Sequence, residues 1–280
     1  MWACAEWVGS LYRTGDRKKW LGEYSQVFNT VEGNSTFYGL PSIDTVTRWA
    51  ESVADGFRFS LKFPRDISHD RQLVGAEHET ERFVEILEVL DRFDCLGPSF
   101  LQLSPHYSGR QFANLDRYLR SLPKSFPYAV EVRHADYFAD DQLESDLNAV
   151  LGELGIDRCL FDSRPLFSKP PADDIECESQ RRKPRSPFRT TVTARRPMLR
   201  LVGRNDLNEA VPWVEEWAPI IAGWIDDSLE PFIFAHSPND AFAPLFAKRL
   251  HDEIRKHSDR VPELPEWSGV TDVKQQKSLF

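Results

Sequence analysis

The 280-residue sequence has few cysteines and few glycines, and both shortages exclude whole classes of protein. Its four cysteines lie far apart and form no CxxC pair, which excludes a zinc ribbon or a thioredoxin-type motif. Four cysteines in this length are also too few for a disulfide scaffold. The 14 glycines follow no repeat, which excludes a collagen-like fibre. We therefore expect reduced thiols in a globular, cytoplasmic protein.

Long apolar runs and common cofactor motifs are also missing. No run approaches the roughly eighteen apolar residues of a membrane span, and residues 1–7 do not resemble a signal peptide. We therefore expect no membrane partner. No GxGxxG, Walker loop or HExxH motif occurs, so we also expect no nucleotide cofactor of the usual kind. The net charge of −9 argues against nucleic-acid binding by the molecule as a whole.

Short β-rich runs alternate with amphipathic helical patterns along the chain. The predicted strands span residues 2–7, 27–33, 57–63, 99–104, 128–133, 158–162, 198–202 and 231–236. Helical stripes of apolar residues span residues 43–53, 83–90, 143–154, 211–224 and 242–254, with weaker patterns at 18–26 and 111–121. Eight βα-sized units predict an α/β fold of the TIM-type (β/α)8 barrel class, with an open doubly wound sheet as the alternative. The predicted domain spans residues 1–269, and a polar, disordered tail is predicted at 270–280.

One connection, residues 163–196, departs from this pattern. It holds nine basic residues, four acidic residues and five prolines, and it shows no helical stripe. We call this segment the basic excursion and expect it to replace the helix after the sixth predicted strand. Its most basic stretch is Arg181-Arg182-Lys183-Pro184-Arg185.

Polar side chains gather where the predicted strands end, which is where α/β barrels carry their chemistry. We expect four of them to be catalytic: Glu32, Lys62, Glu131 and Asp162. Six more are expected to bind substrate: Asn34, Gln102, Arg133, His134, Arg164 and His236. The seventh predicted strand adds a weaker contribution from Arg200 and Arg204. Each of these residues could instead have a structural role: it could form an ion pair at the rim, cap a turn, or be a histidine that is hydrogen-bonded at a strand end.

Several of these residues lie in motifs that resemble those of the YecE-like family, also called domain of unknown function 72. The motifs are FNTVEGNSTFY at 28–38, GFRF at 56–59, LQLSP at 101–105 and AVEVRH at 129–134. The resemblance covers most of the chain and implies a TIM-type barrel with polar residues at its strand ends, but no established reaction. The sequence departs from the family pattern at Gly33, at Val202, where a histidine is usual, and at residues 235–240.

The strand-end residues suggest a hydrolase-like enzyme acting on a phosphoester or on a sugar-like polar substrate. Paired carboxylates can act as general acid and base when their pKa values differ. Lys62 and Arg133 would stabilise negative charge, while Asn34 and Gln102 would orient hydroxyl groups.

Two other hypotheses stay open. In one, Glu131, Asp162 and His236 hold a divalent metal such as magnesium, manganese or zinc. In the other, the protein is a non-catalytic module that binds nucleic acid or a metabolite through the basic excursion. Its nucleic-acid contacts would be Arg181, Arg182, Lys183 and Arg185.

Overall fold

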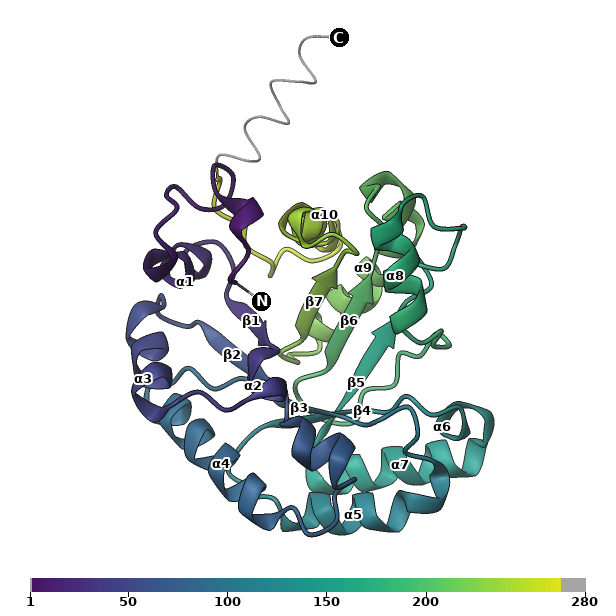
Figure 1. The fold of residues 1–280 in the computed structure, drawn as a ribbon. Coiled ribbons are helices and arrows are strands. Elements are labelled where there is room, and N and C mark those ends of the chain that lie inside the picture. Colours follow the sequence, from purple (N-terminus) through teal and green to yellow (C-terminus); the bar gives the residue numbers. More distant parts are fainter. Residues whose placement is uncertain (1, 268–280) are drawn as a thin grey trace.

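Parallel strands curl around a common centre and carry helices on their outer side (Figure 1). The computed structural model describes residues 2–267, so the tail predicted at 270–280 lies outside the described residues. The strands are β1 (Thr30–Gly33), β2 (Arg58–Leu61), β3 (Ser99–Gln102), β4 (Tyr128–Glu131), β5 (Asp157–Asp162), β6 (Met198–Val202) and β7 (Phe232–His236). Each coincides with a run that the sequence pattern predicts.

Ten α-helices lie before, between and after these strands within residues 2–267. They are α1 (Arg17–Ser25), α2 (Ser35–Tyr38), α3 (Ile43–Ser52), α4 (Glu77–Arg92), α5 (Phe112–Ser121), α6 (Asp136–Ala139), α7 (Asp141–Leu154), α8 (Asp174–Arg182), α9 (Val211–Asp226) and α10 (Ala243–Arg255). Local signals in the sequence explain several boundaries. Ser42 caps α3 by accepting a hydrogen bond from the Thr45 amide, and Gly155 ends α7 in a left-handed conformation with a φ of 66°.

The strands form two parallel sheets that continue into each other. One sheet has the order β1-β2, and the other has the order β3-β4-β5-β6-β7. Isolated bridges from Phe59 to Leu96 and from Lys62 to Phe100 join β2 to β3. Among the described residues, no ladder joins β1 to β7. The fold is therefore an α/β fold with a curled parallel sheet, which is open between β1 and β7 and is linked between β2 and β3 by isolated bridges alone among the described residues.

The strand predicted at residues 2–7 is absent, and this corrects the eight-stranded prediction. The segment ends in a 3-10 helix, η1 (Ala5–Trp7), and its backbone then bonds locally, because the Tyr12 amide donates to the Trp7 carbonyl at 2.9 Å. Its two tryptophans pack in different hydrophobic clusters: Trp2 lies 5.0 Å from Trp49, whereas Trp7 packs with Tyr12. Anchoring the two rings separately prevents a straight strand between β1 and β7.

The basic excursion contains a helix that the sequence pattern did not predict. Helix α8 begins after Asp173, whose side chain accepts a hydrogen bond from the Glu176 amide at 2.7 Å. Its buried side chains are Glu176 and Ser179, both polar. A helix that buries polar side chains shows no apolar stripe, which is why the periodicity missed it.

Alternation along the strands divides the interior of the sheet into layers. Phe100, Ala129, Cys159, Met198 and Phe234 form a buried apolar cluster inside the curl. Two residues further along each strand the side chain points to the same face, so Gln102, Glu131 and Arg200 form the next layer. The fold therefore sets polar side chains above an apolar floor, at the carboxyl ends of the strands.

Within residues 2–267, no helix combines the length and apolar character needed to cross a bilayer.

Candidate functional site

The carboxyl ends of the strands bring a set of buried and half-buried polar side chains together. We call it the strand-end cluster, and it consists of Glu32, Lys62, Gln102, Glu131, Arg133, Arg200 and His236. Six of these seven residues are among the predicted site residues. Five of its residues lie on the strands β1, β3, β4, β6 and β7. Lys62 directly follows β2, and Arg133 lies two residues after β4.

Arg200 lies at the centre of the cluster and binds both carboxylates. Its Nε donates to Glu32 Oε2 at 2.6 Å, and one terminal nitrogen donates to Glu32 Oε1 at 2.9 Å. The other terminal nitrogen donates to Glu131 Oε2 at 2.6 Å. Sequence reasoning gave Arg200 only a weak role. Its parity with Met198, two residues earlier on a buried strand, was the signal that it faces inward.

A chain of hydrogen bonds runs from Glu131 to Lys62. Glu131 Oε1 accepts from Arg133 Nε at 2.6 Å and from Gln102 Nε2 at 2.9 Å. The side-chain oxygen of Gln102, Oε1, in turn accepts a hydrogen bond from Lys62 Nζ at 2.7 Å. The Lys62 ammonium also lies 3.7 Å from the centre of the Phe37 ring, a cation–π contact. Lys62 is thus held in place without a carboxylate of its own.

Glu32 has two further partners on the other side of Arg200. The Asn34 amide donates to Glu32 Oε1 at 2.7 Å. His236 Nε2 lies 3.1 Å from Glu32 Oε2 and donates its proton to this carboxylate. Burial lowers the pKa of His236 although Glu32 opposes the shift, so the imidazole is neutral at pH 7.

Both carboxylates of the cluster are ionised at neutral pH. Burial by itself would raise the pKa of Glu131, but the attraction of Arg133 and Arg200 lowers it to about 2. Burial acts on Glu32 in the same way, and Arg200 and His236 hold its pKa well below the usual value. Neither group is a protonated acid at pH 7, so the pair lacks the split pKa values that carboxylate acid–base catalysis requires.

Lys62 is a titratable group of the cluster whose pKa lies close to neutrality. Burial is the main cause that lowers its pKa to about 8, and repulsion from Arg200 adds to the shift. His69 lies close by, with its ring 5.0 Å from that of Phe37, and burial together with Lys62 lowers its pKa to about 4. Lys62 can therefore give or accept a proton near neutral pH, whereas His69 stays neutral.

Three predicted site residues lie outside this network. Asp162 points to the outer side of β5, where it accepts a hydrogen bond from Trp217 Nε1 at 2.8 Å and pairs with Arg164. Arg164 also pairs with Glu216 on the surface. The ring of His134 accepts a hydrogen bond from the Asp136 amide at 3.2 Å. These contacts fit the structural alternative for all three residues.

The metal-binding hypothesis also loses its ligand set. Glu131 and His236 belong to the cluster, but Asp162 faces Trp217 on the opposite side of the sheet. Among residues 2–267, no group of three or more histidine, cysteine, aspartate or glutamate side chains is arranged to hold a metal ion. The donors named from the sequence therefore do not fit a divalent cation.

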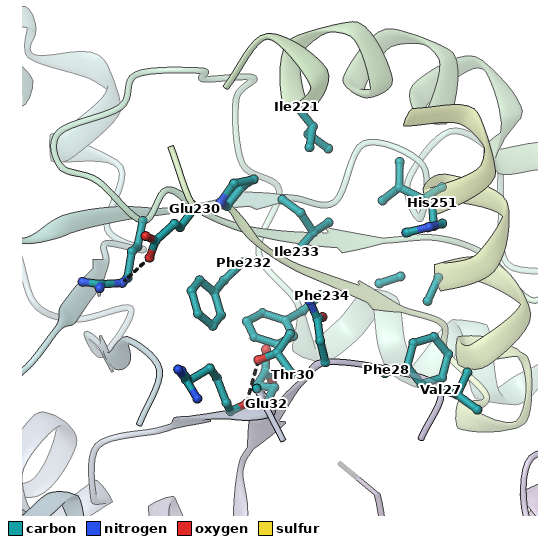
Figure 2. A pocket seen from close by; sticks show the side chains of 18 of the residues that line it. Val27, Phe28, Thr30, Glu32, Ile221, Glu230, Phe232, Ile233, Phe234 and His251 are labelled. Atoms are coloured by element: carbon teal, nitrogen blue, oxygen red, sulfur yellow. Dashed lines mark hydrogen bonds and ion pairs between the residues drawn. The ribbon is translucent and has the colours of Figure 1, made fainter. Parts of the chain in front are cut away.

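A cavity of about 1090 Å³ extends from the amino ends of the strands into the opening between β1 and β7. Figure 2 shows Phe232 and Phe234 of β7 beside Thr30 and Glu32 of β1 in this space. Glu32 and His236 belong both to the cavity lining and to the strand-end cluster. The cavity is large enough for a small molecule, and it reaches the cluster at this hydrogen-bonded pair.

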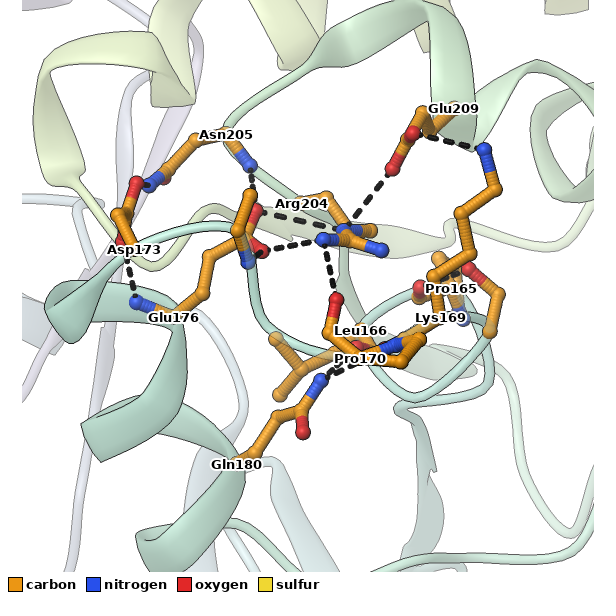
Figure 3. Close-up of polar contacts among 12 residues, drawn as sticks. Pro165, Leu166, Lys169, Pro170, Asp173, Glu176, Gln180, Arg204, Asn205 and Glu209 are labelled. Atoms are coloured by element: carbon orange, nitrogen blue, oxygen red, sulfur yellow. Dashed lines mark hydrogen bonds and ion pairs between the residues drawn. The ribbon is translucent and has the colours of Figure 1, made fainter.

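The basic excursion is fixed close to the same strand ends. Figure 3 shows Arg204, just after β6, between Glu176 of α8 and Glu209. Arg204 and Glu176 are almost fully buried, and Arg204 Nε lies 3.0 Å from Glu209 Oε2. The Ser163 hydroxyl, just after β5, donates to the Pro184 carbonyl at 2.7 Å. These contacts hold both ends of the segment 176–184 against the sheet.

Comparison with known proteins gives the chain close relatives in sequence. Its residues 1–268 match the family model described as protein of unknown function DUF72. The UPF0759 protein YecE of Escherichia coli strain K12 is 35% identical over 279 residues, which cover 100% of this chain and 97% of that protein. The protein of the same name from E. coli O157:H7 matches with the same identity and coverage.

Solved structures agree with the fold. A DUF72 family protein from Enterococcus faecalis V583 superposes with a TM-score of 0.64 at 19% identity and covers 84% of this chain and 92% of its own. A DUF72 family protein from Thermotoga maritima MSB8 gives a TM-score of 0.65 at 18% identity, with 91% and 95% covered. With its whole described length matched by the family model, and with its similarity in sequence to the UPF0759 protein YecE, this chain belongs to the DUF72 family.

Proposed function

We propose that the protein is an enzyme that binds a small anionic substrate, such as a phosphoester, at the strand-end cluster. One observation carries the proposal: Arg133 uses its Nε to bind Glu131, while its two terminal nitrogens have no hydrogen-bond partner among the described residues. The side chain is 15% exposed, so a ligand can reach it. A guanidinium edge with two free nitrogens matches the bidentate geometry of phosphate or carboxylate oxygens.

The charge balance supports an anion. Lys62, Arg133 and Arg200 are cationic and face the carboxylates of Glu32 and Glu131, and His236 is neutral at pH 7. Arg200 is saturated by the two carboxylates, which leaves Lys62 and Arg133 to act on a ligand. Buried cations with an excess of positive charge are stabilised when an anion binds.

Lys62 supplies the chemistry in this proposal. With a pKa of about 8, it can donate a proton to a leaving oxygen or take one from a water molecule near neutral pH. Gln102 holds the Nζ atom of Lys62 in place through a hydrogen bond. Arg133 would neutralise negative charge that develops on the substrate. This arrangement replaces the carboxylate pair that the sequence suggested, because both carboxylates are ionised and serve to hold Arg200 and Arg133.

The nucleic-acid alternative has less support. Arg181 and Arg182 have exposed side chains, but both pair with Glu178 on the same helix. Arg185 lies over the Phe167 ring at 4.2 Å. The exposed cations of the excursion are thus partly neutralised, which weakens a phosphate-backbone contact.

A thermal-shift experiment with inorganic phosphate and a panel of phosphomonoesters tests the proposal. An anion present at 100 times its Kd should stabilise the protein by about 2.7 kcal/mol, which raises the Tm by several degrees. We expect Arg133→Gln to lose this shift, measured from its own Tm. The matched control is Arg195→Gln, which removes a surface arginine that pairs with Glu230. Absence of any anion-dependent shift in the wild type, or an equal shift in Arg133→Gln, would reject the proposal.

A further inference from the structure

Lys183 is set apart from the other cations of the basic excursion. Arg181 and Arg182 have side chains that are 74% and 77% exposed, and both pair with Glu178. Lys183, at the end of α8, is half-buried. Its ammonium has no hydrogen bond or ion pair with any residue in the part of the chain that the structure describes. A half-buried lysine without a partner loses part of its hydration, which a bound anion would compensate.

Two anchors hold the segment that carries Lys183 at the ends of β5 and β6. The hydrogen bond from Ser163 to the Pro184 carbonyl ties the adjacent residue to the end of β5. The buried contact between Arg204 and Glu176 ties α8 to the end of β6. Between these two anchors, the charge of Lys183 interacts with Arg200, Arg133, Glu32 and Glu131, which are the charged groups of the cluster.

We propose that Lys183 is a further substrate-binding residue of the strand-end cluster and that, with Lys62 and Arg133, it selects a dianion such as a phosphate monoester over monoanions. This inference rests on the proposed function and names the charge class of its substrate. With Lys183 included, the cations Lys62, Arg133, Lys183 and Arg200 outnumber the two carboxylates by two. An anion with two charges balances this excess, whereas a monoanion leaves one charge uncompensated.

Proton uptake provides a second signature. Burial, with repulsion from Arg200, lowers the pKa of Lys183 to about 8, close to that of Lys62. A bound anion favours the charged form of each lysine and so raises both pKa values. Binding at pH 8 should therefore take up protons, which calorimetry detects as a dependence of the binding heat on the ionisation enthalpy of the buffer.

The experiment compares the binding of inorganic phosphate, a dianion at pH 8, with that of dimethyl phosphate, a monoanion, by isothermal titration calorimetry. We expect Lys183→Gln to weaken phosphate binding by about tenfold or more, since a charge-assisted contact is lost. Dimethyl phosphate should change by less than about threefold, and the proton uptake with phosphate should fall. Lys183→Arg keeps the charge and should retain most of the affinity for phosphate.

Arg181→Gln is the matched control, because it removes one positive charge from the same helix at an exposed position. Equal phosphate affinity in the wild type and in Lys183→Gln would overturn the role of Lys183 while the proposed function stands. Equal losses in Arg181→Gln and Lys183→Gln would also overturn it, because binding would then depend on the charge of the surface. Failure of the wild type to bind any anion would reject the proposed function, and the role of Lys183 with it.

Discussion

Arg200 determines the electrostatic state of its neighbours. Its guanidinium donates to Glu32 and to Glu131 through all three of its nitrogens. The same positive charge lowers the pKa values of both carboxylates and contributes to the low pKa of Lys62. Arg200 therefore helps to keep both acids ionised, and its repulsion adds to the effect of burial on the pKa of Lys62.

Replacing Arg200 by methionine should be strongly destabilising. The change leaves Glu32 without its cationic partner and removes one of the two from Glu131, and breaking a buried ion pair on one side costs about 3–5 kcal/mol. Urea denaturation at pH 7 measures the free energy of unfolding. Arg195→Met removes a surface arginine and should stay within about 0.5 kcal/mol of the wild type. A loss below about 1 kcal/mol in Arg200→Met would contradict the central role of this residue.

At the scale of elements, helix α8 behaves as a polar insert rather than as an amphipathic helix of the outer layer. Glu176 accepts the backbone amides of Ala172 and Asn205, each at 2.9 Å, and pairs with Arg204. Its attachment to the fold thus depends on hydrogen bonds and charge rather than on apolar area. The attachment matters for function because α8 carries Lys183 at its end.

Replacing Glu176 by glutamine should loosen the basic excursion. The isosteric change keeps one acceptor oxygen but removes the charge that compensates buried Arg204, so local opening becomes easier. Limited trypsin digestion followed by mass spectrometry should show cleavage within residues 181–185 at least about tenfold faster than in the wild type. Asp174→Asn alters an exposed acid on the same helix and should leave the rate unchanged. Equal rates in all three proteins would show that Glu176 does not anchor the helix.

For the whole molecule, the curl of the sheet brings together residues that lie far apart in sequence. Glu32 and Arg200 are separated by 168 positions, and His236 lies 204 positions from Glu32. Their contact closes the polar layer across the opening between β1 and β7, where no ladder joins the described strands. The stability of the molecule should therefore depend on the ionisation of this layer.

Acid should destabilise the protein through Glu32 and Glu131. Both folded-state pKa values lie below the unfolded value of 4.5, so the stabilisation is complete above pH 4.5 and is lost as the pH falls toward about 2. We expect the free energy of unfolding, from urea titrations between pH 7 and pH 3, to fall by a few kcal/mol. Glu131→Gln should flatten this dependence, while Glu178→Gln on the surface of α8 should not. Parallel curves for the wild type and Glu131→Gln would refute this explanation.

The sequence by itself was sufficient for the α/β class, for seven strands and for most helices. Their apolar periodicities and caps, such as Ser42 and Gly155, are local properties that do not depend on distant residues. It was also sufficient to predict that Glu32, Lys62, Gln102, Glu131, Arg133 and His236 lie close together, since polar residues at the ends of apolar strands meet at one rim in a parallel sheet.

Tertiary structure decided the rest, because the remaining features depend on partners far along the chain. The strand predicted at residues 2–7 gave way to separate packing of Trp2 and Trp7. Asp162 accepts a hydrogen bond from Trp217, and Arg200 lies between two glutamates that no local pattern links to it. Helix α8 buries Glu176 against Arg204, a pairing across 28 positions, and that contact brings Lys183 toward the strand ends. Electrostatic pairing of buried groups acts through space, so their roles could be assigned only once the sheet had curled.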